Sequence, residues 1–350
     1  MMTLQHNDIW RRDFDISTSL YNDISIRKWR PANIAAAFLL AAAMLTGCGG
    51  SSDSFEDEPQ NVTDNESPQE IRLKADVWRM MEGTRATFYE TGTLASGSFT
   101  AAAYSANTTT AYFTPVTVNW DTDKWIFSDG KHYWPSEGAL DFFAYMPAAV
   151  PSYITDMSDV ASLVTYTARN PQFKCKNLPM TYDSESSSAG QGSGLQEFVY
   201  ALKTNRTKAL DGASGVTLDF LHPFTKIILQ LSSTQADIHI NKITLKGIKN
   251  NGTYAHSSGW TPTGDATNLV LTLDGNYSAN DVIGTLLMIP QDWAGEIEVN
   301  ATWTDWGAQL PHILKTTKAT TWAAGTSYTY TFTITETDLI VNTTKFTEQW

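Results

Sequence analysis

The C-terminal part of the chain alternates between large apolar residues and small hydroxyl residues with a period of two. In the segment "SYTYTFTIT", Tyr328, Tyr330, Phe332 and Ile334 point one way, and the serine and threonines between them point the other way. This alternation is typical of a half-buried antiparallel strand. Shorter runs rich in β-branched residues predict further strands at 215–220, 238–248, 268–273 and 296–303.

Turn signals separate these runs, and they predict the fold class. Asn251-Gly252, Asp274-Gly275 and Asp129-Gly130 are dipeptides that favour tight turns. No long amphipathic helix is evident, although a short helical turn is expected near 157–164. Many short strands separated by such turns predict an all-β protein built from antiparallel β-sandwiches.

The length of the chain predicts two such domains. A chain of 350 residues has room for about two domains of ~150 residues. Pro223, in "LHPF", interrupts two strand-like runs and marks the expected break between them. We therefore expect an N-terminal sandwich at 71–222 and a C-terminal sandwich at 223–350.

The N-terminal region has the order of a secretory signal. Residues 27–30, "RKWR", are basic, and residues 32–45 form an apolar run of fourteen, which is short for a membrane span. The ending Leu45-Thr46-Gly47-Cys48 resembles a bacterial lipobox, which implies a signal peptide at 1–47 and a lipid on Cys48. The region before "RKWR" is longer than usual, so either the true start lies downstream or the leader is long.

Residues 48–70 are expected to form an acidic, disordered tether between the lipid and the folded part. They contain seven acidic residues and no lysine or arginine, which is too little apolar surface for a packed core. The position of the acids resembles a surface-export signal of some lipoproteins, which implies the outer leaflet of the outer membrane. The whole chain carries a net charge of −13, which disfavours a nucleic-acid partner.

Catalytic and metal-binding patterns are not recognisable in the sequence. The six histidines are scattered, and none forms a pair at metal-ligand spacing. We therefore predict no enzyme, no metal and no cofactor, although two distant carboxylates could still meet in the fold. Cys175, between two lysines, is either a mildly activated thiol or an incidental residue of a β-rich segment.

Two tryptophans offer a different chemistry. Trp303 and Trp306, in "WTDW", are the residues that we expect to be most exposed, and exposed indole rings can stack on sugars. The alternative is that they fill a sandwich core, as tryptophans in such folds commonly do. Trp303 and Trp306 are thus a candidate ligand platform for glycan or a host protein.

A set of segments, taken in order, resembles the fimbrillin-like lipoproteins of the type V pilin superfamily. They are "GTRATF" at 83–88, "KHYWPSEGALDFFAYMP" at 131–147, "EFVYA" at 197–201 and "VTLDFLHPFTKIILQLS" at 216–232. The resemblance covers nearly all of residues 71–350, and it implies two tandem transthyretin-like β-sandwich domains.

The resemblance also implies a way of assembly. In polymerising members, an arginine-specific protease removes the first strand, and a strand from another subunit fills the open groove. On this sequence, cleavage would fall between Arg85 and Ala86 and remove a strand within 71–79, with Arg79 as a nearby competitor. The donor strand would come from about 327–350, where Ile340 and Val341 supply apolar side chains.

Two hypotheses follow for the function. The first is a structural subunit of a surface fimbria, which binds other subunits head to tail and is anchored in the outer membrane by lipid before maturation. The second is a surface lipoprotein or fimbrial tip adhesin that binds glycan or host protein through exposed aromatic residues.

Overall fold

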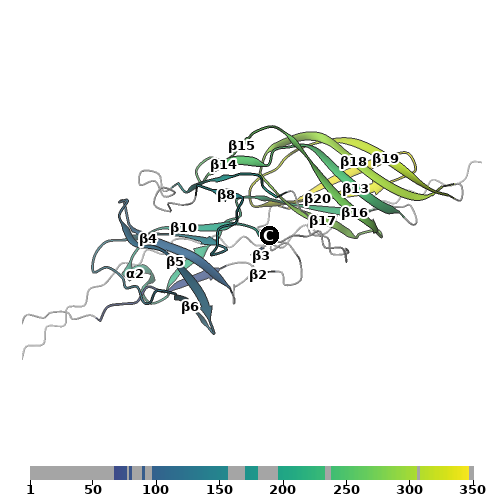
Figure 1. Ribbon diagram of the computed structural model, residues 1–350. Helices are drawn as coiled ribbons and strands as arrows, with labels where there is room; N and C mark the ends of the chain where they lie inside the picture. Colours follow the sequence, from purple (N-terminus) through teal and green to yellow (C-terminus); the bar gives the residue numbers. More distant parts are fainter. Residues whose placement is uncertain are drawn as a thin grey trace, which may run out of the picture. The chain divides into compact units, whose positions relative to one another are not determined.

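The computed structural model describes residues 67–76, 79–80, 89–90, 97–156, 170–179, 196–232, 238–305 and 308–346. Within these ranges nearly all regular structure is β-strand, and the one helix is the single turn α2, Lys208–Asp211 (Figure 1). The predicted all-β class is therefore confirmed. The helical turn expected near 157–164 lies outside the described residues.

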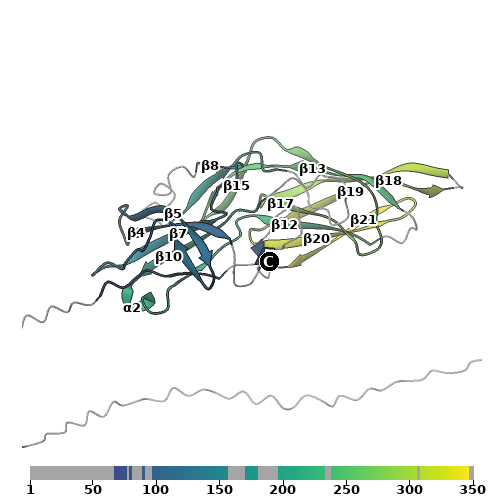
Figure 2. The same cartoon turned by 60° about the horizontal axis from the view of Figure 1, so that its bottom comes forward.

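A five-stranded antiparallel sheet organises the first half of the described chain (Figure 2). Its strands, in spatial order, are β10 (Val199–Arg206), β7 (Leu140–Met146), β4 (Ser98–Ser105), β5 (Ala111–Asp121) and β6 (Lys124–Phe127). Both faces of its central strands are buried, so β4 and β7 have almost continuous apolar sequences instead of alternating ones.

One face of this sheet carries the N-terminal core, together with a separate two-stranded sheet. That small sheet is parallel and pairs β1 (Leu73–Asp76) with β11 (Val216–Asp219). The N-terminal core contains the inward residues of both sheets: Ile71, Leu73, Ala75, Phe99, Ala101, Ala103, Val118, Trp125, Phe142, Ala144, Val199, Val216, Leu218 and Phe220 among others.

Two four-stranded sheets enclose the C-terminal core, drawn in green to yellow in Figure 1. The first has β17 (Val282–Met288), β12 (Thr225–Leu231), β20 (Thr326–Ile334) and β21 (Leu339–Phe346). The second has β16 (Thr267–Asn276), β13 (His239–Ile248), β18 (Asp292–Asp305) and β19 (Ala308–Thr321). The inward face of β20 consists of Tyr328, Tyr330, Phe332 and Ile334, as its alternation predicts.

A further sheet combines strands from before and after residue 223. It has β15 (Gly259–Thr263), β14 (Asn251–Ala255), β9 (Gln172–Cys175) and β8 (Ile154–Thr155). The short strands β2 (Arg79–Met80) and β3 (Tyr89–Glu90) pair with each other. The boundary between domains at 222 and 223 stays a prediction, and residues 64–350 form one compact unit.

Two of the three predicted turns are not turns. Asn251-Gly252 begins strand β14, and Asp274-Gly275 lies inside β16. Asp274 has a φ of 46°, and the pairing of β16 with β13 shifts between Ile240 and Lys242, so the dipeptide forms an irregularity in the ladder. Only Asp129-Gly130 turns as predicted, directly after β6, where Gly130 has a φ of 114°.

Candidate functional site

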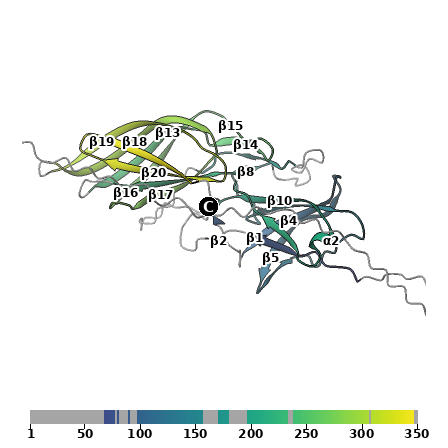
Figure 3. The same cartoon turned by 180° about the vertical axis from the view of Figure 1, so that it is seen from behind.

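The first strand, β1, is held on one edge by β11. Leu73 lies opposite Val216, and the Val216 N–H donates to the Arg72 carbonyl at 2.8 Å. Ile71, Leu73 and Ala75 are buried in the N-terminal core, while the side chains between them face solvent. Figure 3 shows β1, from behind, beside the blue and teal strands of the five-stranded sheet. β1 and the residue before it therefore contribute one row of buried side chains to the N-terminal core, and β1 is paired along one edge with β11.

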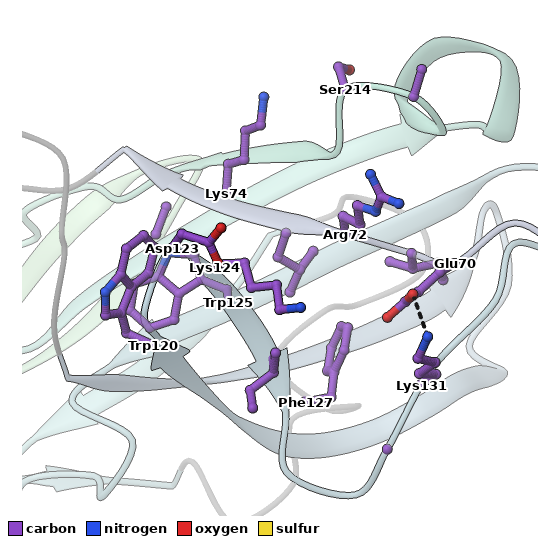
Figure 4. Close-up of a pocket in the computed structure, with 16 residues that line it drawn as sticks. Glu70, Arg72, Lys74, Trp120, Asp123, Lys124, Trp125, Phe127, Lys131 and Ser214 are labelled. Atoms are coloured by element: carbon purple, nitrogen blue, oxygen red, sulfur yellow. Dashed lines mark ion pairs between the residues drawn. The ribbon is translucent and has the colours of Figure 1, made fainter.

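The residues just before β1 are fixed by a second set of contacts. The Ile71 N–H donates to the His132 carbonyl at 2.8 Å, and the Trp134 N–H donates to the Gln69 carbonyl at 2.9 Å. Glu70 also forms an ion pair with Lys131 at 3.1 Å, drawn as a dashed line in Figure 4. The Lys131 side chain is 65% exposed, so this ion pair adds little to stability.

The main contribution of β1 is hydrophobic. Full burial of a side chain such as Ile or Leu stabilises by about 1.5–3 kcal/mol, which makes Ile71 and Leu73 worth on the order of 3–6 kcal/mol together, an upper estimate. Loss of β1 would leave this part of the core open to water and would free the edge of β11. Both defects can be repaired by another strand with the same spacing of apolar residues.

A pocket of about 710 Å³ lies beside β1. Figure 4 shows Lys74 of β1 and the preceding Arg72 on one side of it and the β5–β6 hairpin with Lys124 and Trp125 on the other. Trp125 packs edge to face with Trp120, their ring centres 5.3 Å apart. The pocket thus combines aromatic side chains with basic ones.

The C-terminal strand β21 lies at the edge of its sheet, paired with β20 alone. Leu339 and Val341 point into the C-terminal core, whereas Ile340 is 50% exposed and Phe346 is 51% exposed. The Lys318 ammonium also donates to the Val341 carbonyl at 3.0 Å. Because only the first part of β21 buries side chains, the strand is held less firmly than its neighbour β20.

The predicted donor residues lie on opposite faces of β21. Ile340 and Val341 are adjacent, and successive side chains of a strand point to opposite sides. A groove could therefore accept either the face of β21 that carries Leu339 and Val341 or the face that carries Ile340, but not both at once. The sequence predicts a donor segment at about 327–350, which stays a prediction, and it does not choose between these two faces.

Trp303 is not exposed, and that expectation is wrong. Its side chain is 1% exposed, and the His312 ring of β19 stacks on it with centroids 3.5 Å apart and planes 7° apart. Trp303 has the same parity on β18 as Ile297, Val299 and Ala301, which all point into the C-terminal core. This alternation was the sequence feature that could have predicted burial of Trp303. In the structure, neither face of its indole ring is free.

The remaining predicted residues fall outside the part of the chain that the structure describes. They are Cys48, Arg85, Ala86 and Trp306. Among the described residues, no helix is long and apolar enough to cross a membrane. In the same residues, no cluster of histidine, cysteine or acidic side chains could hold a metal ion.

Cys175 behaves as a buried apolar residue. It lies on β9, and burial raises the pKa of its thiol to about 12, despite a backbone hydrogen bond from Leu178 that acts in the opposite direction. A thiol with this pKa is protonated at neutral pH and is a poor nucleophile. Of the two readings of Cys175, the structure favours the incidental residue.

Together these features define an all-β protein whose first strand completes one core and whose last strand lies on an open edge. The chain belongs to the fimbrillin-like family, whose model matches residues 84–350. This is a family of structural and adhesive proteins, and membership supports a fimbrial subunit or adhesin at the cell surface. The match begins after β1, which ends at Asp76.

Several solved structures are similar to this chain. A candidate cell adhesion protein of Bacteroides ovatus is 16% identical, with a TM-score of 0.48, over 79% of this chain and 95% of that one. Another, of Bacteroides uniformis, is 14% identical, with a TM-score of 0.49, over 79% and 98%. The tip fimbrial protein Mfa3 of Porphyromonas gingivalis is 11% identical, with a TM-score of 0.41, over 80% and 100%. No match was found among curated proteins.

Proposed function

We propose that this protein is a structural subunit of a cell-surface fimbria and that it assembles by donor-strand exchange. Cleavage between Arg85 and Ala86 would separate β1 from the rest of the chain. The open place beside β11 would then accept the C-terminal strand of another copy. The observation that carries this proposal is the position of β1, which fills one stripe of the N-terminal core and, among the described strands, pairs with β11 alone.

The shape of β21 supports the same proposal. Leu339 and Val341 are two residues apart and share one face, as do Leu73 on β1 and Ile71 just before it. A donor strand that enters with Leu339 and Val341 would therefore supply two large apolar side chains at the same spacing as the strand it replaces. The contact joins two different surfaces, so it would extend into a filament rather than close into a ring.

The cleavage step is tested by limited digestion. The form that begins at residue 49 is treated with an arginine-specific protease, and its mass, new N-terminus and oligomers are measured. We expect a new N-terminus at Ala86 and a ladder of SDS-resistant multimers. Arg85→Lys should abolish both, while Arg79→Lys should change neither. Cleavage at Arg85 without multimers would contradict the assembly proposal, and multimers from the uncut Arg85→Lys form would contradict the role of cleavage.

The donor strand is tested on cut protein. Val341→Asp should leave cleavage at Arg85 unchanged and prevent multimers, because a carboxylate cannot enter an apolar groove without a large desolvation cost. Asn342→Asp introduces the same charge one residue later, on the other face of β21, and serves as the matched control. Equal polymerisation of the two variants would exclude Val341 as a donor residue.

Export as a lipoprotein is a separate part of the proposal, and it depends on Cys48. Cells that express the full chain are fed labelled palmitate, and the protein is recovered from the outer-membrane fraction. Label on the wild type and none on Cys48→Ser is the expected result. A labelled Cys48→Ser protein would show that lipid is attached elsewhere.

The adhesin alternative loses part of its basis. Trp303 is buried beneath His312, so the platform of Trp303 and Trp306 has no free face at Trp303. An adhesive surface on this chain would therefore have to use other residues.

A further inference from the structure

Two strand edges face each other without pairing on the N-terminal side of the molecule. β6 is the outermost strand of the five-stranded sheet, and among the strands that the structure describes β1 pairs only with β11. In the described part of the chain, no backbone hydrogen bond joins β1 to β6. The pocket of about 710 Å³ lies between them, and we refer to it, with residues 70–75 and 124–127, as the β1–β6 seam.

The lining of the pocket shows that strand edges bound it. A pocket on the face of a sheet is lined by every second residue of a strand, because alternate side chains point away. This one is lined by the consecutive residues 70–75 and 124–127. Figure 4 shows both strands running along it, with side chains above and below. The pocket therefore opens onto backbone as well as onto side chains.

Neighbouring hydrogen bonds fix which backbone groups of β6 are free. The Ser128 N–H donates to the Thr117 carbonyl of β5 at 2.8 Å. The Trp120 N–H of β5 points away from β6 and donates to the Gly97 carbonyl, just before β4. Antiparallel pairing alternates strictly along a strand, so the N–H groups of Trp125 and Phe127 point away from β5 and toward the seam.

On the other side of the seam, the odd-numbered residues of 71–75 direct their backbone groups away from β11. The Arg72 carbonyl faces β11, where it accepts from Val216, and the Ile71 N–H faces the opposite side, where it donates to His132. The backbone groups of Leu73 and Ala75 consequently point toward the seam as well. Unpaired groups of this kind on a strand edge are a template for another strand.

The charges around the seam are mostly positive. Arg72, Lys74 and Lys124 line it, and none of the three forms an ion pair with any residue that the structure describes. Among the described residues that line the pocket, Asp123 is the one acidic residue besides Glu70, which is paired with Lys131. This is a local excess of positive charge on a chain whose net charge is −13. Exposed lysines and arginines attract an anionic ligand and mainly accelerate its binding.

We propose that the β1–β6 seam binds an extended acidic peptide by strand addition. The backbone of the peptide would pair with one of the two free edges, its carboxylates would face Arg72, Lys74 and Lys124, and its apolar residues would contact Phe127, which is only partly buried. Free backbone donors and acceptors in a row favour a peptide over an acidic sugar, which has no matching repeat. The proposal does not rest on donor-strand exchange, because it concerns the uncut chain with β1 in place.

The test uses the uncut protein from residue 49 and a fluorescein-labelled octapeptide that alternates glutamate with valine. Fluorescence anisotropy should show saturable binding that weakens as salt is raised. Lys124→Glu and Lys74→Glu should each weaken binding at least fivefold. Lys176→Glu makes the same charge change at an exposed lysine outside the seam and should leave the affinity unchanged. Far-ultraviolet circular dichroism checks that the three variants are folded.

Three further probes give the outcomes that would overturn the proposal. An octapeptide that alternates lysine with valine should not bind, and equal binding would remove the role of charge. The glutamate peptide with every second amide N-methylated should bind at least tenfold more weakly, and unchanged affinity would exclude strand addition. An oligogalacturonate should not compete, and competition that depends on Lys124 would assign the seam to an acidic sugar instead.

Discussion

Trp303 shows how a side chain's parity on its strand outweighs its residue type. The residue stands near the end of β18, in a short polar sequence that suggests exposure. Its parity nevertheless directs the indole into the C-terminal core, where His312 covers the ring. An indole in that position contributes through packing rather than through binding.

The stability of the protein should therefore depend on this residue. Trp303→Ala should lower the free energy of unfolding by roughly 3–5 kcal/mol, because it removes a large buried side chain and leaves a cavity. Ile313→Ala, on the adjacent strand β19, removes a side chain that is 60% exposed and should change it by less than about 0.5 kcal/mol. Urea denaturation measures both. A Trp303→Ala protein as stable as the wild type would mean that the indole is not packed as described.

At the scale of elements, a charged cluster links three strands of the sheet β16-β13-β18-β19. The Lys246 ammonium, on β13, contacts Glu296 at 2.6 Å and Glu298 at 3.0 Å, both on β18. Lys315, on β19, contacts the same two carboxylates. The pKa values of Glu296 and Glu298 are both lowered, and the main cause for each is the hydrogen bond from Lys246.

These shifts give the cluster a pH dependence of known sign. A carboxyl whose pKa is lower in the folded state stabilises the fold above its unfolded value, here 4.5, and loses this effect as the pH falls through the folded value. Lys246→Met should therefore lower the melting temperature at pH 7, and the difference from wild type should shrink as the pH falls below 4.5 and vanish once both carboxyls are protonated in the folded state. Lys242→Met, on the same strand but outside the cluster, should show no such pH-dependent difference. A Lys246→Met deficit that persists in acid would indicate lost packing rather than lost charge.

Strands with one buried face could be predicted from the sequence, and those with two could not. One face of β20 is buried and the other is only partly buried, so its apolar and polar residues alternate with a period of two. β4, "SFTAAAYS", and β7, "LDFFAYM", are buried on both sides and show no alternation. The parallel pairing of β1 with β11 also left no local signal, since it joins segments far apart in the chain.

The candidate site was predictable only in part for the same reason. The position of the first strand and of the last strand followed from a family resemblance. The seam did not, because Arg72 and Lys74 are about fifty residues away from Lys124 in the sequence and approach it only in the fold. None of these residues belongs to a local motif, so only the tertiary structure brings the two segments together.

At the scale of the whole molecule, a third core joins strands from before and after residue 223. Phe173 of β9 stacks on Tyr254 of β14 with ring centres 4.8 Å apart, and the Tyr200 and Tyr254 hydroxyls are 2.7 Å apart. The pKa values of both tyrosines are raised, mainly by burial, so these hydroxyls stay protonated and hydrogen-bonded. This middle core also contains Ala102, Tyr104, Phe143, Tyr145, Tyr153, Ile154, Cys175, Leu178, Phe198, Phe224, Leu287 and Ile289.

Separation of the chain at the predicted domain boundary should therefore weaken both parts. Residues 67–222 and 223–346, expressed separately, should each melt at least several degrees below the whole chain, because each fragment lacks the middle-core side chains that the other fragment supplies. Mixing the two fragments should raise both melting temperatures again. Calorimetry gives the values for the fragments and the mixture. Fragments that melt at the temperature of the whole chain, mixed or not, would show that the two parts are energetically independent.

The pairing of β1 with β11 also sets the order in which the molecule can form. β1 is made early, yet its partner is made only after the whole five-stranded sheet. Contacts between distant segments form slowly, so β1 should be among the last strands to dock. A newly made chain that still lacks this contact would present the same uncovered core as a mature chain from which β1 has been cut. Cleavage beyond β1 would then return the protein to the last step of its own folding, with a neighbouring subunit in the place of its first strand.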